Sequence, residues 1–211
     1  MSFELSLDDG RFLVKLVRKT IMMFLETQKK CPIPMDTPTK LKEKRGVFVT
    51  LNSIKGNNKH LRGCIGYPMP EISLVEATID SAINSATRDP RFNPVDSQEM
   101  EHIFIEISVL TPPTQILVSD PKNFVNEINV GRDGLIVERG LYKGLLLPQV
   151  PVEWNWDAEE FLINGCMKGG LTPDAWLIEG TKIYKFSCII VKELTLDGEV
   201  VLEDMRKQNS S

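Results

Sequence analysis

Two apolar runs separated by a short turn constrain the fold of this chain more than any other feature. Residues 46–54 are typical of a β-strand, and Gly56-Asn57-Asn58 is typical of a turn. The chain then returns as a second strand with the sequence Leu-Arg-Gly-Cys-Ile-Gly at positions 61–66, called here the hexapeptide. Glycines in a strand allow another part of the chain, or a ligand, to approach closely. The sequence therefore predicts a hairpin that carries a cysteine and an arginine in a closely packed place.

The spacing of apolar residues, broken by proline and glycine, predicts the remaining elements. Helices are expected at 6–26, 73–87, 120–128 and 157–167, and strands at 102–110, 135–137, 141–147 and 182–194. Strands in pairs, interleaved with helices, predict an α+β fold with mostly antiparallel sheets. With 211 residues, the chain is long enough for one large domain or two small lobes. We expect a single domain over residues 1–211.

The charge of the chain and its scattered cysteines narrow the class of protein. The net charge of -4 argues against a general phosphate-binding surface, so nucleic acid is a disfavoured partner. No apolar run is long enough to cross a membrane, and the first residues do not resemble a secretory signal. Four cysteines that lie far apart predict reduced thiols, and hence a cytoplasmic protein. Oligomeric state has no signature in the sequence.

Metal and cofactor sites have no clear signature either. The chain has two histidines and no close grouping of cysteine and histidine, so no metal site is expected. The glycine-rich stretches match neither a dinucleotide-binding fingerprint nor a phosphate-binding loop. The sequence therefore identifies no cofactor.

Cys64 is the candidate nucleophile. On a regular strand His60, Arg62 and Cys64 would point to one face, where the arginine favours a thiolate and the histidine can serve as base. Gly63 and Gly66 would then let a ligand approach the backbone. The alternative is a small buried residue in a tight β structure, with Arg62 paired to a carboxylate.

A second candidate group follows the helix expected at 73–87. Arg88 and Arg91 could clamp an anionic ligand from a loop, with Asp89 between them. The alternative is a salt bridge at the helix end that fixes the loop, with Phe92 anchored in the core.

Two further polar residues are candidates for ligand contact. Glu106 lies mid-strand among isoleucines, so it either faces water or meets a cation such as Arg62 or Arg91. Gln149 follows an apolar strand, where it can meet a ligand or cap the neighbouring backbone.

Several sequence blocks occur together in order. They are Gly-Val-Phe-Val-Thr-Leu at 46–51, the hexapeptide, Arg-Asp-Pro-Arg-Phe at 88–92, Ser-Val-Leu-Thr-Pro-Pro at 108–113, Gly-Leu-Ile-Val at 134–137, Leu-Leu-Leu-Pro-Gln-Val at 145–150, Cys-Met-Lys-Gly-Gly-Leu at 166–171, and Trp176. In this combination the chain resembles the AMMECR domain family, named for the Alport syndrome, mental retardation, midface hypoplasia and elliptocytosis chromosomal region. It departs from the family at 169–171, where Gly-Gly-Leu replaces the common Ala-Gly-Leu.

The resemblance implies a stand-alone α+β domain of two lobes, with the hexapeptide near a cleft between them and with no settled biochemical role. It also implies a shared pathway with Memo-type or radical-SAM proteins. Two functions are favoured, and a nucleic-acid-associated factor is a third that the acidic charge of the chain disfavours. One is an enzyme or modification factor that uses Cys64 on a small anionic or peptide-like ligand, held by Arg62 and Arg91. The other is a non-catalytic adaptor, in which the same residues shape a groove for a partner protein.

Overall fold

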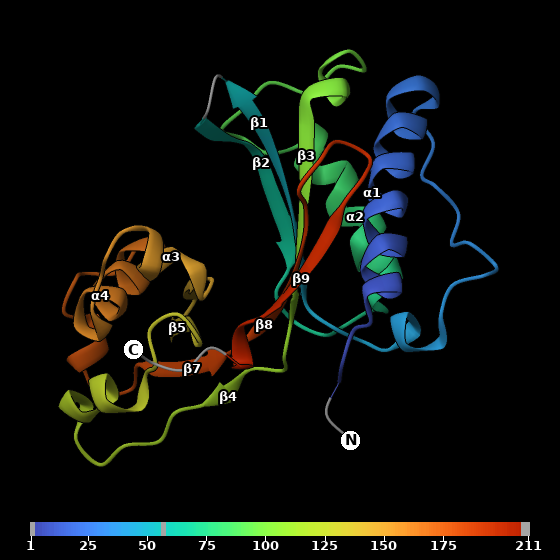
Figure 1. Ribbon diagram of the computed structural model, residues 1–211. Coiled ribbons are helices and arrows are strands. Elements are labelled where there is room, and N and C mark those ends of the chain that lie inside the picture. Colours follow the sequence, from blue (N-terminus) through green and yellow to red (C-terminus); the bar gives the residue numbers. More distant parts are fainter. Residues whose placement is uncertain (1–2, 56–57, 208–211) are drawn as a thin grey trace. The chain divides into compact units, whose positions relative to one another are not determined.

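The chain forms two compact units, each with its own sheet and core. The structure is a computed structural model, and it describes residues 3–55 and 58–207 (Figure 1). The first unit comprises Met1–Leu110 and Ile189–Glu203, and the second comprises Thr111–Cys188 and Asp204–Ser211. The sheets have five and four strands. In the five-stranded sheet residues 47–55 pair antiparallel with 58–67 and 103–109, and in the four-stranded sheet residues 134–139 pair antiparallel with 142–146 and 182–186, which confirms the predicted α+β class.

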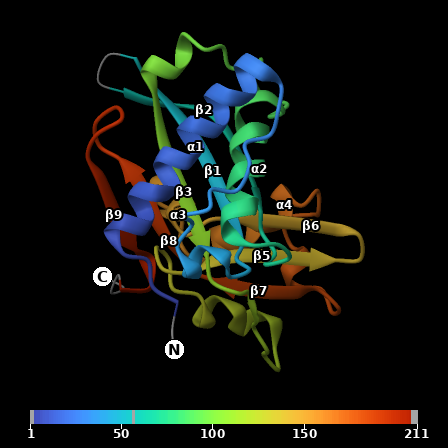
Figure 2. The same ribbon diagram turned by 90° about the vertical axis from the view of Figure 1, so that its right-hand side faces the viewer.

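The first unit is a five-stranded sheet with helices on one face. Its strand order is β2-β1-β3-β8-β9. The strands are β1 (Val47–Lys55), β2 (Asn58–Tyr67), β3 (Ile103–Leu110), β8 (Cys188–Glu193) and β9 (Val200–Asp204). The helices are α1 (Leu7–Thr27), α2 (Leu74–Thr87) and the short 3-10 turns η1 (Thr39–Lys42) and η2 (Glu99–His102). Figure 2 shows that α1 and α2 both lie on the same face of this sheet.

Capping and apolar spacing explain why these segments are helical. Ser6 and Asp9 form a reciprocal capping box at the start of α1, which satisfies backbone N–H groups that have no partner within the helix. Ser73 caps α2 in the same position. Leu13 and Val17, which lie on the apolar face of α1, are completely buried. The predicted helices at 6–26 and 73–87 are confirmed.

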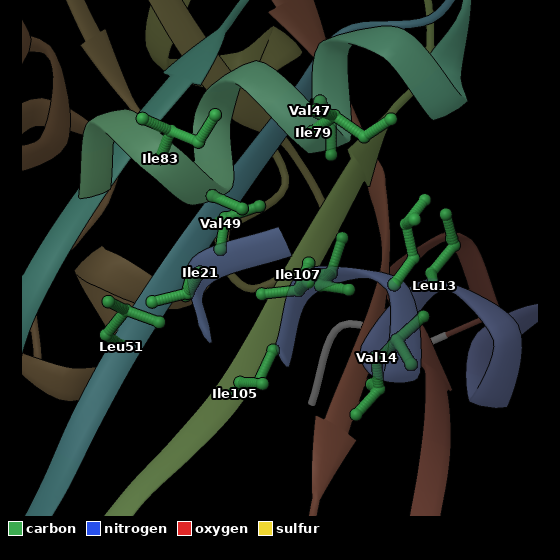
Figure 3. Packing of buried hydrophobic residues seen from close by; sticks show 14 of the residues in the cluster. Leu13, Val14, Ile21, Val47, Val49, Leu51, Ile79, Ile83, Ile105 and Ile107 are labelled. Atoms are coloured by element: carbon green, nitrogen blue, oxygen red, sulfur yellow. The ribbon is translucent and has the colours of Figure 1, made fainter. Parts of the chain in front are cut away.

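Alternation along the strands builds the core of the first unit. Val49 and Leu51 of β1, and Ile105 and Ile107 of β3, are buried against the two helices (Figure 3). Burying such a side chain stabilises the fold by about 1.5–3 kcal/mol. Because side chains alternate between faces, the intervening residues of β1 and β3 point to the face that α1 and α2 do not cover.

The second unit is a four-stranded sheet with helices packed against it. Its strand order is β4-β7-β5-β6. The strands are β4 (Thr114–Gln115), β5 (Gly134–Arg139), β6 (Tyr142–Leu146) and β7 (Lys182–Phe186). The helices are α3 (Gln149–Glu153), α4 (Ala158–Lys168) and the 3-10 turns η3 (Pro121–Glu127), η4 (Ala175–Leu177) and η5 (Met205–Lys207). The predicted hairpin around Gly140 and the predicted helix at 157–167 are confirmed.

Three predicted elements need correction. The strand expected at 182–194 is two strands, β7 and β8, which belong to different sheets. Ser187 separates them, because its N–H donates to Thr111 Oγ1 (2.8 Å) and its hydroxyl donates to the carbonyl of Arg132 (2.9 Å). The helix expected at 120–128 is the 3-10 segment η3, and β9 was not predicted. Residues 56 and 57 of the predicted turn lie outside the described residues. Among the described residues, no helix has the length and apolar character needed to cross a membrane.

Candidate functional site

A β-bulge in the hexapeptide decides which side chains share a face. Gly63 lies opposite Leu51 and Leu61 lies opposite Asn52, so Arg62 is an extra residue in β2. The extra residue reverses the alternation, since a shift of one position moves side chains to the other face. Cys64 pairs with Thr50, and both point away from the helices. His60 pairs with Ser53 and lies on the opposite face.

The predicted trio of His60, Arg62 and Cys64 is therefore wrong. Regular alternation was assumed across residues 60–64, and the bulge interrupts it. His60 is exposed and has no route to act as base for Cys64 from the other side of the sheet.

Helix α2 fixes the hexapeptide through a close backbone contact. A Cβ at position 63 would lie 2.1 Å from the carbonyl oxygen of Ser85, so this approach requires glycine. The Ile65 N–H donates to Ser85 Oγ (2.9 Å), and the Ser85 hydroxyl donates to the carbonyl of Val49 (2.7 Å). Ser85 thus bridges the two strands. Gly66 is constrained in a similar way, because a Cβ there would lie 2.2 Å from the carbonyl of Val47.

Asp89 and Arg91 cover the outer edge of β2. The Cys64 N–H donates to Asp89 Oδ2 (2.8 Å), and Arg91 Nη2 donates to the carbonyl of Cys64 (3.4 Å). Arg91 also binds the Asp89 carboxylate through Nε (2.9 Å) and Nη2 (2.7 Å). These hydrogen bonds lower the pKa of the buried Asp89 carboxyl to about 2. The pair closes an edge that would otherwise expose unpaired backbone groups.

Arg62 has a structural partner rather than a ligand. Its Nε and Nη2 donate to the two carboxylate oxygens of Glu99 (3.1 and 2.8 Å), and Nη1 donates to the carbonyl of Asn93 (2.9 Å). The guanidinium also lies 5.9 Å from the ring centroid of Phe92. The alternative of a carboxylate partner for Arg62 is therefore the one observed. Arg88 is exposed and contacts Asn84, four residues earlier on α2.

The Cys64 thiol is partly buried and accepts a hydrogen bond from the Thr50 hydroxyl (3.2 Å). Burial raises the pKa of the Cys64 thiol above its ordinary value, although the Thr50 hydrogen bond and the charge of Arg91 act in the opposite direction. The expectation that Arg62 stabilises a thiolate is wrong, because the neighbouring cation is Arg91 and burial outweighs it. The resting group is a protonated thiol at neutral pH.

The helix-free face of β1 and β3 surrounds this thiol with further polar groups. We call the residues on it the Cys64 face: Phe48, Thr50, Asn52, Cys64, Phe104, Glu106 and Ser108. Glu106 lies opposite Thr50 on β3 and pairs with Lys59 Nζ at 3.0 Å, so of the two alternatives it meets a cation, although a different one from Arg62 or Arg91.

Two polar groups of the Cys64 face are buried without a partner. Asn52 is 7% exposed and Ser108 is 1% exposed, and neither Asn52 Nδ2 nor Ser108 Oγ has a hydrogen-bond partner among the described residues. Sequence analysis missed both residues and Thr50. The alternation of β1 and β3 could have placed them on one face, but only with the register known, and the sequence does not give the register.

Gln149 belongs to the second unit, where it is the first residue of α3. Its Oε1 atom is buried without a hydrogen-bond partner among the described residues, so the expected backbone cap through that oxygen is not observed. Within the described ranges, no group of three or more His, Cys, Asp or Glu residues is arranged to hold a metal ion.

Comparison with known proteins identifies relatives that extend over nearly all of the chain. Protein PH0010 of Pyrococcus horikoshii is 54% identical over 194 residues, which cover 92% of this chain and 94% of that protein. Protein MK0488 of Methanopyrus kandleri is 50% identical over 210 residues, which cover 99% and 100%. The crystal structure of the uncharacterised PH0010 matches with a TM-score of 0.91 and 52% identity, over 96% of this chain and 100% of that chain.

The AMMECR1 family profile matches residues 14–191, a range that contains the hexapeptide, Asp89 and Glu106. The resemblance drawn from the sequence blocks is thereby confirmed, and this chain belongs to the AMMECR1 family.

Proposed function

We propose that the protein binds a small anionic or peptide-like ligand on the Cys64 face and presents the Cys64 thiol to it. The supporting observation is that the other polar or glycine residues of the hexapeptide have structural roles. Gly63 and Gly66 permit close contacts, and Arg62 is held by Glu99. Cys64, by contrast, is of intermediate exposure as a residue, unlike the other three cysteines, and its thiol contacts the Thr50 hydroxyl. A packing role does not require this thiol.

The neighbouring groups favour a ligand with hydrogen-bond acceptors. Asn52 Nδ2 is a donor, and Ser108 Oγ can donate, so a carbonyl or carboxylate oxygen would satisfy both. A buried polar group without a partner is costly, and a ligand that supplies the partner recovers that free energy. Lys59 and Arg91 lie beside the face, but each is paired with a carboxylate, Glu106 and Asp89 respectively, so they offer further N–H donors rather than net positive charge.

In the catalytic form of this proposal, Cys64 acts as the nucleophile of an enzyme or modification factor. Attack requires the thiolate, and burial keeps the thiol protonated. The rate of attack by Cys64 would therefore rise with pH as the thiol loses its proton. A bound ligand that favours the thiolate would have the same effect at lower pH. In the non-catalytic form the thiol only contacts a partner protein or ligand, and the raised pKa of Cys64 is the observation that favours this form.

Thermal unfolding separates a ligand site from a packing motif. We expect Cys64→Ala and Cys64→Ser to melt within a few degrees of the wild type, a change of about 1 kcal/mol or less. Ser108→Ala should match or exceed the wild type, because it removes an unpartnered buried hydroxyl. A large loss specific to Cys64→Ser would assign the thiol to packing.

Ligand-observed NMR tests binding directly. The probes are N-acetyl amino-acid amides and small carboxylates, measured with the wild type, Cys64→Ala and Ser108→Ala, and with Tyr142→Ala of the second unit as control. We expect the wild type to bind a probe. Binding should weaken in Cys64→Ala and Ser108→Ala and stay unchanged in Tyr142→Ala. Absence of binding by both probe classes would contradict the proposal.

A further inference from the structure

Two tryptophans of the second unit form a stacked pair beside α3. The ring centroids of Trp154 and Trp156 are 6.1 Å apart, and the ring planes are inclined by 18°. Trp156 packs against the core of the second unit, whereas Trp154 is 68% exposed. Val152, which is 57% exposed, adds to the surface. We call these three residues the tryptophan platform.

The backbone holds the platform in a defined position. Asn155, between the two indoles, has a φ of 53°, a left-handed conformation that asparagine adopts more readily than most residues. The Trp156 N–H donates to the carbonyl of Pro151 (2.8 Å) and closes the turn. Because Trp154 rests on a ring that is itself anchored in the core, little side-chain freedom remains to be lost when a ligand binds.

The charge around the platform selects the kind of ligand. Residues 144–167 contain Glu153, Asp157, Glu159 and Glu160 and no lysine, arginine or histidine. All four carboxylate residues are exposed. The face of an indole ring attracts cations, and negative charge that lies close to Trp154 in the sequence, on Glu153 and Asp157, adds to that attraction. The same charge repels phosphate, which disfavours a nucleic acid that would stack its bases on the ring.

We propose that the tryptophan platform docks a basic segment of a partner protein, with an arginine or lysine side chain stacked on Trp154. The proposal concerns a surface of the second unit and is independent of the Cys64 face. Trp154 supplies the stacking surface, and the carboxylates near it in the sequence supply the complementary charge. Val152 offers an apolar contact for the stem of the stacked side chain.

Calorimetry and indole fluorescence with three peptides test this proposal on the full chain. The peptides are acetyl-Gly-Arg-Gly-Arg-Gly-amide, its lysine analogue, and a neutral analogue with citrulline in place of arginine. We expect the two basic peptides to bind more tightly than the citrulline peptide. Trp154→Ala should weaken binding of the arginine peptide by about twofold to fivefold, which corresponds to the roughly 0.5–1 kcal/mol of a cation–π contact at an exposed site.

Two matched variants complete the test. Glu159→Gln should weaken binding about twofold to threefold and reduce its salt dependence, while Tyr142→Ala, another exposed aromatic residue of the second unit, should leave binding unchanged. Equal binding of the basic peptides by Trp154→Ala and the wild type would show that they bind through the general negative charge of the protein and not through Trp154. Equal binding of the citrulline peptide would assign the surface to apolar docking. Either result, or no binding of the basic peptides at low salt, overturns the proposal.

Discussion

At the scale of single residues, Cys64 is set apart by access rather than by a low pKa. Cys31, Cys166 and Cys188 are buried, whereas Cys64 is partly accessible. Reaction with an alkylating reagent needs both access and a thiolate. Access makes Cys64 the first cysteine to react, and burial makes that reaction slow near neutral pH.

Alkylation of the native protein should therefore follow a distinctive pH profile. We expect iodoacetamide to label Cys64 before the other three cysteines, with a rate that still rises above pH 9, because burial raises the pKa of the thiol. Arg91→Gln should slow labelling further, since it removes the cation that favours the thiolate. Mass-spectrometric mapping at several pH values measures both effects. A rate that reaches its plateau below pH 8 would contradict the raised pKa.

Asp89 should contribute to the dependence of stability on acid. Its pKa is lowered from an ordinary 3.8 to about 2, so its contribution is complete above about pH 5 and is lost progressively as the pH falls through 3.8 to 2 and below. The shift corresponds to about 2 kcal/mol of folding free energy. In Asp89→Asn this part of the acid loss should be absent, and stability at pH 7 should fall by at least that amount. Urea unfolding at pH 7, 4 and 2.5 is the measurement, and parallel pH curves for the two proteins would contradict it.

At the scale of elements, α2 and β2 are packed together through a direct contact between the backbone of Gly63 and the backbone of Ser85. Gly63→Ala would place a Cβ 2.1 Å from the backbone oxygen of Ser85, and backbone on both sides leaves no flexible group to move. We expect a loss of about 3 kcal/mol or more, at the upper end of overpacking effects. Ser85→Ala is the matched comparison, since it keeps the space and removes only the bridging hydroxyl. It should cost about 1–3 kcal/mol. Chemical unfolding of both variants measures the difference, and a Gly63→Ala protein as stable as the wild type would contradict the close approach.

The elements also show where sequence reasoning succeeds and where it stops. Apolar spacing and capping residues predicted α1, α2, α4 and both hairpins, because those signals are local. The bulge at Arg62 carries no local signal. Its presence depends on the pairing of β2 with β1, and it reversed the predicted faces of His60 and Cys64. The partners of Arg62 and Glu106 likewise come from distant segments, so the sequence indicated that cations and carboxylates would pair but not which ones.

At the scale of the whole molecule, the two units have separate cores. Leu51 and Ile107 belong to one hydrophobic cluster, and Phe161 and Leu135 belong to the other. The break at Ser187 escaped prediction because residues 182–194 are uniformly strand-like, and the hydrogen bonds that Ser187 donates to Thr111 and Arg132 mark the division. A strand pattern alone cannot show that the chain changes sheets.

Separate cores predict separate local stabilities. Phe161→Ala should cost about 3–5 kcal/mol, a usual value for a buried phenylalanine. We expect hydrogen exchange to accelerate mainly in β5, β6, β7 and α4, while amides of β1 and β3 keep most of their protection. Leu51→Ala should give the reverse pattern. Equal loss of protection in both units for each variant would show that the chain unfolds as one cooperative body.

The Ser85 hydroxyl between β1 and β2 has a consequence for the order of folding. Strand pairing in a hairpin is usually complete once the two strands meet, but here the Ile65 N–H reaches the carbonyl of Val49 through a side chain of α2. The register that direct strand pairing defines is therefore stabilised further when a segment some twenty residues along the chain is helical and docked. Docking of α2 thus reinforces the strand register, and the hydrogen bonding of the hairpin that carries Cys64 is complete only with the helix in place.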